Sequence, residues 1–180
     1  SRGQRVFVER IDIEGNTTTL DEVIRRQFNT VEGDPFNPRE IRNSAERLRA
    51  LGYFSDVQAE SRQGSSPEQV IVDVNVEEQP TGSLSFGASY GVSTGVGFNV
   101  GLSEKNFLGR GQELDASFST ASGTQSSGIT FVEPYFLGRD LRAKAQIWYN
   151  TTDRLNSDYR TRSVGALTSR PYAFSARPWE

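Results

Sequence analysis

Five of the eight carboxylates in the first forty residues can be tested as ligands of a cation, because hard cations prefer oxygen ligands. They are Asp12, Asp21, Glu22, Asp34 and Glu40. Their spacing fits no calcium-binding loop. Three of them, Asp21, Glu22 and Glu40, stand where helices are expected to begin, and negative charge there stabilises the helix dipole. The sequence therefore predicts no metal site.

Side chains suited to catalysis are scarce in the rest of the chain. The sequence contains no histidine and no cysteine, which removes the commonest general base near neutral pH and all thiol chemistry. Lys105 and Lys144 could activate a serine, but neither lies in a supporting motif. Gly95 and Gly97 lie inside an alternating segment and not at the strand-to-helix turn of a phosphate-binding loop. We expect a protein that is not an enzyme and that carries no cofactor.

Charge is divided unevenly along the chain, whose formal net charge is −3. Residues 1–80 hold 10 basic and 15 acidic side chains, and residues 81–180 hold 10 basic and 8 acidic. Neither part has a basic run of the kind that binds nucleic acid, so we expect no nucleic-acid partner. No apolar run is long enough for a transmembrane helix, although barrel strands cross a bilayer with a much weaker signal. The chain starts at Ser1 without a signal peptide, and we expect it to be a piece of a longer protein.

The first eighty residues combine strands with helices. Residues 6–14 are strand-like, and the apolar residues expected to face a core are Phe7, Ile11 and Ile13. Thr19, followed three residues later by Glu22, is a capping-box pattern that predicts the start of a first helix.

A second helix has clear signals at both ends. Asn37 at the N-cap and Pro38 at the first helical position predict its start, and Gly52 predicts a left-handed end. Two strands follow as a hairpin, at residues 54–61 and 70–78.

Residues 81–180 are typical of β-strands throughout. Apolar residues recur at every second position in five segments, and a sixth strand is expected within residues 158–169. In the first segment Leu84, Phe86, Ala88 and Tyr90 alternate with glycine and serine. The segments are about nine to eleven residues long, which is what a tilted strand needs to cross a bilayer.

The links between these expected strands are of two kinds. Residues 106–110 and 134–139 share an aromatic residue followed by Leu-Gly-Arg, whereas the other links are polar. If the strands alternate in direction, the similar links lie at one rim and form an interfacial aromatic girdle of Phe107, Tyr135 and Phe136. A water-soluble β-sandwich shows the same alternation. Small neutral residues on the second face, together with the recurring aromatics, favour the start of a transmembrane barrel.

Two stretches resemble known families. Residues 6–79, with LGYF opening the second strand, resemble a POTRA domain, a periplasmic module that precedes certain outer-membrane barrels. TGSLSFGASYG, followed by GVGFNVGLSEKNFLGRGQ and then EPYF, is similar to the start of the barrel in BamA-type outer-membrane assembly proteins. The resemblance implies an α+β POTRA domain (βααββ) in residues 1–80, followed by antiparallel β-strands in residues 81–180 that form the start of a transmembrane β-barrel. About six strands of an incomplete barrel are expected, and residues 170–180, with two prolines, depart from a hairpin pattern.

The resemblance also implies a function at the cell outer membrane, with the POTRA domain in the periplasm. The partners would be unfolded outer-membrane proteins, accessory lipoproteins of the assembly complex and outer-membrane lipid. Unfolded strands cannot enter lipid with unpaired backbone groups, and an exposed strand edge supplies hydrogen-bond partners. The first barrel strand would open laterally as such an edge, and its expected site residues are Leu84, Phe86, Gly87, Ser89 and Gly91. The POTRA strand at residues 54–61 is expected to accept a peptide by strand addition, with Phe54, Val57 and Ala59 as its site residues.

Two other functions stay open on the sequence alone. A two-partner secretion transporter has similar architecture, but its pore would pass one exoprotein. A water-soluble, β-rich adhesion module would stay dispersed without detergent. An isolated six-stranded piece of a barrel has two open edges and one apolar face. We therefore expect this fragment to self-associate through those surfaces unless detergent covers them.

Overall fold

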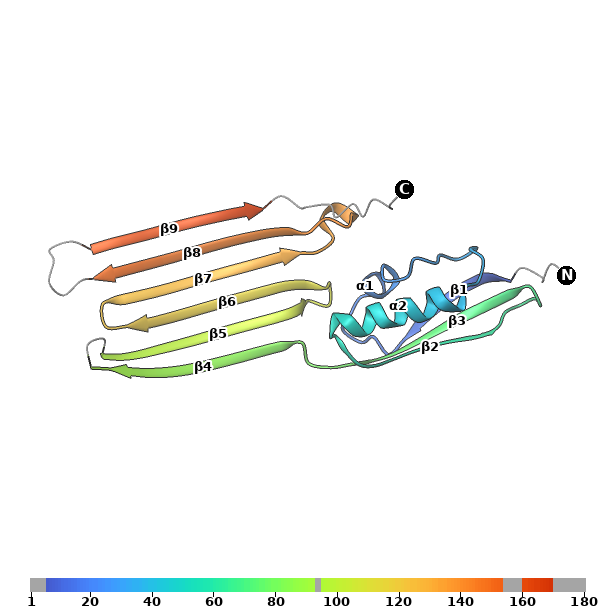
Figure 1. The fold of residues 1–180 in the computed structure, drawn as a ribbon, viewed down its shortest axis with the longest axis horizontal. Helices are drawn as coiled ribbons and strands as arrows, with labels where there is room; N and C mark the ends of the chain where they lie inside the picture. The colour runs from blue at the N-terminus through green and yellow to red at the C-terminus, as the bar shows by residue number, and fades with distance from the viewer. Residues whose placement is uncertain (1–5, 93–94, 154–159, 170–180) are drawn as a thin grey trace, which may run out of the picture. The chain divides into compact units, whose positions relative to one another are not determined.

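The computed structural model describes residues 6–92, 95–153 and 160–169 of the chain. It divides into two compact units, Ser1–Thr81 with Leu108–Arg110 and Gly82–Phe107 with Gly111–Glu180. Figure 1 shows that the α-helices occur in the first unit and that long strands make up the second. None of the helices in the described part of the chain has the length and apolar character needed to cross a membrane.

The first unit is a three-stranded sheet with two α-helices. Its elements, in chain order, are β1 (Phe7–Glu14), α1 (Asp21–Arg25), α2 (Pro38–Leu51), β2 (Phe54–Gln63) and β3 (Gln69–Glu78). The strand order is β1-β3-β2, with β3 parallel to β1 and antiparallel to β2. The βααββ order predicted from the sequence is confirmed.

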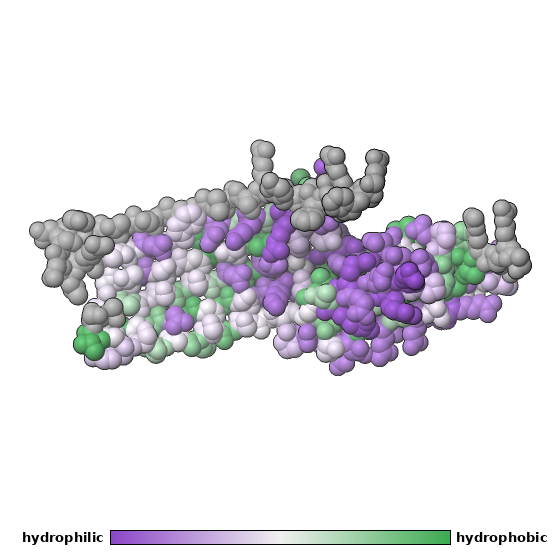
Figure 2. Space-filling view, viewed as in Figure 1, coloured by the Kyte–Doolittle hydropathy of each residue, from purple (hydrophilic) through white to green (hydrophobic). Residues whose placement is uncertain are grey.

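A hydrophobic core lies within this unit. The valines of β3 alternate into it, and α1 and α2 contribute their apolar stripes, which include Val23, Ile24, Ile41, Ala45 and Leu48. Leu48 and Ile24 are fully buried. On the outward side of α2, by contrast, Figure 2 shows a dense cluster of hydrophilic residues. This amphipathic arrangement is why the helix forms against the sheet.

The predicted core face of β1 is wrong at its start. Phe7 is 37% exposed, whereas its neighbour Val8 is buried. A β-bulge between Val8 and Arg10 shifts the register with β3, and an extra residue reverses the side to which alternate side chains point. Val8 and Ile11, three positions apart, can therefore both enter the core.

The two helix starts differ from each other. Asn37 caps α2 by accepting a hydrogen bond from the backbone of Arg39, and Gly52 ends the helix at φ 73°, so both predictions are confirmed. The predicted capping box of α1 is wrong, because the helix begins after Leu20 without a side-chain cap. The Thr19 backbone N–H instead donates to the carboxylate of Glu78, at 2.6 Å.

The second unit is a single antiparallel sheet in which strands adjacent in sequence are adjacent in space. Its elements are β4 (Gly82–Gly91), β5 (Gly95–Phe107), β6 (Gln112–Ala121), β7 (Thr124–Glu133), the 3-10 turn η1 (Phe136–Gly138), β8 (Ala143–Asp153) and β9 (Arg160–Ser169). The sixth strand predicted within residues 158–169 is confirmed as β9. The outer strands of this sheet are β4 and β9.

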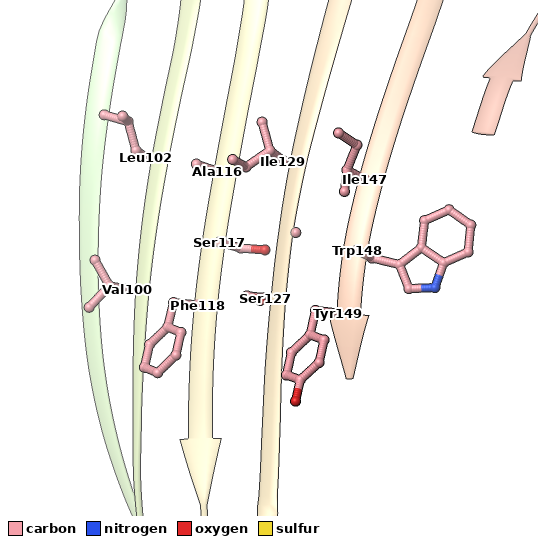
Figure 3. A pocket seen from close by; sticks show the side chains of 11 residues that line it. Val100, Leu102, Ala116, Ser117, Phe118, Ser127, Ile129, Ile147, Trp148 and Tyr149 are labelled. Atoms are coloured by element: carbon pink, nitrogen blue, oxygen red, sulfur yellow. The ribbon is translucent and has the colours of Figure 1, made fainter. Parts of the chain in front are cut away.

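One face of this sheet is apolar and uncovered. Phe86 is 74% exposed and Tyr90 is 77% exposed, and the same face also presents Leu84, Val96, Phe98, Ile129 and Ile147. Small side chains at Ala116 and Ser127 leave a hollow of about 390 Å³ in it, bordered by Val100, Leu102, Phe118, Ile129, Ile147 and Tyr149 (Figure 3). A sheet face of this kind needs an apolar environment that the described chain does not supply.

The two Leu-Gly-Arg links share left-handed φ angles at the same two positions. Leu108 and Gly109 lie at φ 55° and 71°, and Leu137 and Gly138 lie at φ 57° and 70°. Two consecutive left-handed residues tightly reverse the chain, and a leucine rarely adopts this conformation. The resemblance between the two links in sequence is therefore also a resemblance in structure.

Candidate strand-edge sites

Each unit presents a strand edge, and these edges are the candidate functional sites. β2 is an outer strand of the first sheet, and β4 is an outer strand of the second. Backbone N–H and C=O groups on the open side of an outer strand can pair with an added strand. The structure thus places both sequence-predicted sites on outer strands, and their role in binding stays a prediction.

The side chains of β4 fall on two contrasting faces. Leu84 and Phe86 lie on the apolar face, opposite Leu102 and Val100 of β5. Gly87, Ser89 and Gly91 belong to the opposite, small-residue face.

On that small-residue face, each of three successive β4–β5 pairs joins one glycine to one polar residue. The pairs are Ser85 with Gly101, Gly87 with Asn99 and Ser89 with Gly97. A Cβ atom added to Gly87 would lie 2.1 Å from Asn99 Oδ1, so the amide lies directly over the glycine. Side-chain contact between these strands on this face is consequently small, and the larger contacts lie on the apolar face.

The predicted site residues of β2 point inward. Phe54 and Val57 are buried and Ala59 packs partly against the core. These three side chains therefore serve the core, and a partner strand at this edge would pair with the backbone of β2. The sequence signal at these positions is the alternation of apolar residues, and an ordinary core-facing strand shows the same signal.

Asp56 and Arg49 contact the β2 edge and were not predicted from the sequence. The Val57 N–H donates to Asp56 Oδ1 at 2.9 Å, and the Val57 C=O accepts from the Arg49 guanidinium of α2. Nothing local in the sequence signals the contact from Arg49, because it depends on how α2 packs against β2.

The end of β3 carries a carboxylate, that of Glu78, that accepts several hydrogen bonds. The Glu78 carboxylate accepts hydrogen bonds from the Thr17 hydroxyl at 2.7 Å, the Thr18 N–H at 2.9 Å and the Thr19 N–H at 2.6 Å. Partial burial alone would raise the pKa of Glu78, but these hydrogen bonds outweigh it and lower the pKa to about 2. Glu78 therefore stays ionised and holds the segment before α1 against β3.

Glu133 has a similar structural role in the second unit. Its Oε1 accepts from the Tyr135 N–H at 2.9 Å, and its Oε2 accepts from Gln112 Nε2 at 2.6 Å. The Glu133 carboxylate thus connects β6 to the loop that follows β7. Among the residues described, no three acidic side chains gather closely enough to hold a metal ion.

Comparisons with known proteins agree with this two-part architecture. Residues 6–79 match the POTRA family, described as a surface antigen variable number repeat, and residues 106–177 match the Omp85 superfamily domain. A BamA crystal structure from Haemophilus ducreyi, which lacks POTRA domains 1–3, superposes with a TM-score of 0.77 at 27% identity, over 92% of this chain and 32% of that one. CdiB from Escherichia coli superposes with a TM-score of 0.57 at 18% identity, over 92% and 32% of the two chains, and shows a shared fold alone.

Curated relatives match almost the whole chain. The outer membrane protein assembly factor BamA of Neisseria meningitidis serogroup B is 31% identical over 91% of this chain and 21% of its own length. BamA of Buchnera aphidicola is 34% identical, over 95% of this chain and 27% of its own length. A putative outer membrane protein assembly factor of Treponema pallidum is 35% identical, over 98% and 21%. The chain thus spans between a fifth and a third of the length of these relatives.

A POTRA module followed by an Omp85 strand meander defines the class: outer-membrane β-barrel proteins of the Omp85 superfamily. Within this class, the chain belongs to the BamA family of outer-membrane protein assembly factors. It is accordingly an outer-membrane protein segment whose POTRA domain lies in the periplasm.

Proposed function

We propose that the protein containing this chain assembles β-barrel proteins and inserts them into the outer membrane. In this proposal the strand edges of β2 and β4 lend backbone hydrogen-bond partners to incoming chains. The clients are unfolded outer-membrane proteins, whose strands cannot enter hydrocarbon with unpaired N–H and C=O groups. Pairing with an edge removes that penalty while the rest of the client barrel forms.

The observation that carries the proposal is the position of β4. It is an outer strand of a sheet whose apolar face is uncovered, so its backbone edge and a lipid-facing surface occur on the same element. An edge at this place can offer hydrogen bonds within the bilayer, where water cannot.

The division of the chain follows from the same proposal. Residues 1–80 form the POTRA domain, and residues 81–180 form the first part of a barrel whose remaining strands lie outside this chain. In the whole protein, β4 as the first barrel strand closes against the last and opens laterally. Gly87, Ser89 and Gly91 ease that opening, because glycine and serine hold a partner strand less strongly than larger residues do.

Partners beyond the client belong to this proposal as well. Outer-membrane lipid contacts the apolar face that carries Phe86, Phe98 and Ile147. Accessory lipoproteins dock on the POTRA domain, which has an excess of acidic over basic side chains. The activity needs no catalytic residue, since pairing and insertion break no covalent bond.

Disulfide trapping of a client tests the role of β4. The chain has no cysteine, so a single substitution in it is unambiguous when any native cysteines elsewhere in the whole protein are replaced. Ser85→Cys or Ser89→Cys in the full-length protein is expected to crosslink to a cysteine in a stalled outer-membrane client. Ser117→Cys is the matched control, because β6 is paired on both sides by β5 and β7. If no position on β4 traps a client, the proposed role of this edge is wrong.

The alternative function is a two-partner secretion pore for one exoprotein. The likeness to CdiB concerns the fold alone, whereas relatives above 30% identity carry the name of assembly factors. Crosslinking also separates the two functions: several unrelated clients trapped at β4 support assembly, whereas one exoprotein held inside the barrel supports secretion.

A further inference from the structure

The outer edge of β2 is closed at one end and open at the other. At Val57 both backbone groups are occupied by side chains, the N–H by Asp56 and the C=O by Arg49. In an antiparallel pair, the two groups of one residue point to the same side of the strand. Because β3 lies on the other side of β2, these are the groups that an added strand would need at this position.

A β-bulge reinforces the closed end. The register between β2 and β3 shifts between Phe54 and Asp56, which distorts the strand just before Val57. Bulges and charged side chains at an edge are both devices that block unwanted strand pairing. Two features therefore protect the segment Phe54–Val57 from pairing with an added strand: the bulge and the side-chain hydrogen bonds at Val57.

The other end of β2 has no such protection. Ala59, Ser61 and Gln63 have the same parity as Val57, so their N–H and C=O groups point to the same outer edge. In the described part of the chain, no side chain forms a hydrogen bond with the backbone of these three residues. About half of the edge is thus available to a partner strand.

We propose that Arg49 and Asp56 form a latch on the β2 edge. An extended peptide segment first pairs with the open end, Ala59–Gln63, and then displaces the two side chains as its pairing advances to Val57. This inference rests on the proposed strand addition at β2, and it assigns to that site an entry point and a barrier to full occupancy.

The contacts of Arg49 make its displacement feasible. Its side chain is 46% exposed, and its guanidinium also pairs with Glu46 Oε1 at 2.7 Å. On leaving the Val57 carbonyl it keeps this ion pair and gains water, so no buried charge is left behind. Asp56 also bonds to Gln58 Nε2, at 2.8 Å, and can keep that contact. The latch is held by two part-buried hydrogen bonds that a backbone ladder can replace.

A peptide titration on the full-length protein in detergent tests the latch. The probe is a fluorescein-labelled peptide with the sequence of β4, GSLSFGASYG, and residue-level amide exchange locates its binding. The wild-type protein is expected to show peptide-dependent protection within Ala59–Gln63. The R49A/D56A variant is expected to bind about tenfold more tightly, which corresponds to removing competition from one or two part-buried hydrogen bonds. Its protection should extend to Val57.

The controls separate the latch from other effects. Glu46→Gln removes the ion pair of Arg49 without touching the edge and should bind as the wild type does. Asp56→Asn retains an oxygen that can accept from Val57 and should change binding less than Asp56→Ala. A peptide with prolines at alternate positions lacks the required N–H groups and should give no protection. Circular dichroism checks that each variant keeps its helices.

The outcomes distinguish the latch from strand addition itself. Protection at Ala59–Gln63 with equal affinity in all variants overturns the latch and leaves strand addition standing. The absence of protection at β2 in every variant overturns strand addition at this edge, and the latch with it. Weaker binding by R49A/D56A contradicts the latch directly, since it would show that these side chains help the peptide.

Discussion

The two units use the same alternation of side chains in opposite ways. Among residues with described side chains, fifteen of the buried apolar residues belong to the first unit, and Val132 is the one that belongs to the second. The valines of β3 alternate just as the aromatics of β4 do. What differs is the cover: α1 and α2 lie on one face of the first sheet, whereas no element of the described chain lies on the apolar face of the second.

A strand pattern alone therefore does not define a protein interior. Alternation says that one face avoids water, and only the neighbouring layer decides whether that face meets protein or hydrocarbon. For the first unit the layer is two amphipathic helices from the same chain. For the second unit, the layer that we propose is outer-membrane lipid, in keeping with the match to the Omp85 superfamily domain.

Truncating a core residue should change stability far more than truncating an exposed one. Leu48→Ala should lower the free energy of unfolding of the first unit by about 2–5 kcal/mol, because it leaves a cavity under a fully buried side chain. Phe86→Ala should change it by less than about 1 kcal/mol, because this ring lies in the second unit and is mostly exposed. Urea titration of the full-length protein in detergent, followed by the helical circular dichroism signal, measures both. Equal effects would contradict the contrast between the units.

A lysine introduced on either face of the second sheet tests which face meets hydrocarbon. Ile129→Lys should cost about 2–4 kcal/mol in lipid, because the lysine would enter hydrocarbon, whereas Thr130→Lys on the opposite face should cost much less. The two positions are adjacent in β7 and differ only in the face they occupy. Folding of the full-length protein into lipid vesicles, monitored across a denaturant series, gives both values. If Thr130→Lys proves the more costly, the assigned lipid face is wrong.

A pair of glycines tests how tightly each unit is packed. Gly15 lies at φ 92°, and a Cβ added there would lie 1.9 Å from the Val76 carbonyl oxygen, which is backbone and cannot yield easily. Gly15→Ala should therefore destabilise the first unit by about 1–3 kcal/mol. Gly87→Ala meets only the end of the Asn99 side chain, which can rotate, so its cost should stay below about 1 kcal/mol. Thermal unfolding of the two variants provides the measurement.

The smallest expected effect is a pH dependence specific to the first unit. Because the pKa of Glu78 is lowered from 4.5 to about 2 on folding, its contribution to stability is complete above pH 4.5. It is lost as the pH falls from there towards 2. Glu78→Gln should flatten this part of the stability profile of the first unit, and solvent screening of a partly exposed group keeps the effect modest. An unchanged slope in acid titrations of the variant would show that the Thr17–Thr19 contacts are unimportant.

Much of the fold could be predicted because its signals are local. Asn37 and Gly52 terminate α2 through contacts within one turn, so their residue types are sufficient evidence. Thr19 failed as a cap because Glu78, 59 residues away, accepts a hydrogen bond from its N–H. Phe7 failed as a core residue because a bulge, which depends on pairing with β3, changes the parity of β1. Both errors have the same cause, a distant partner that the local pattern does not contain.

From the sequence alone it was possible to place most strands and helices and to see that a βααββ module precedes a run of alternating strands, because these follow from periodicity, caps and turn residues. The POTRA assignment came from the resemblance to that family. The tertiary structure bore out the expected outer positions of β2 and β4, and it showed that β3 lies between β1 and β2, an order that depends on pairing between distant segments. It also decided that Arg49 reaches the Val57 carbonyl, because that contact exists only once α2 packs against β2. Edges and their protection are properties of assembled sheets, and no single strand carries them in its own residues.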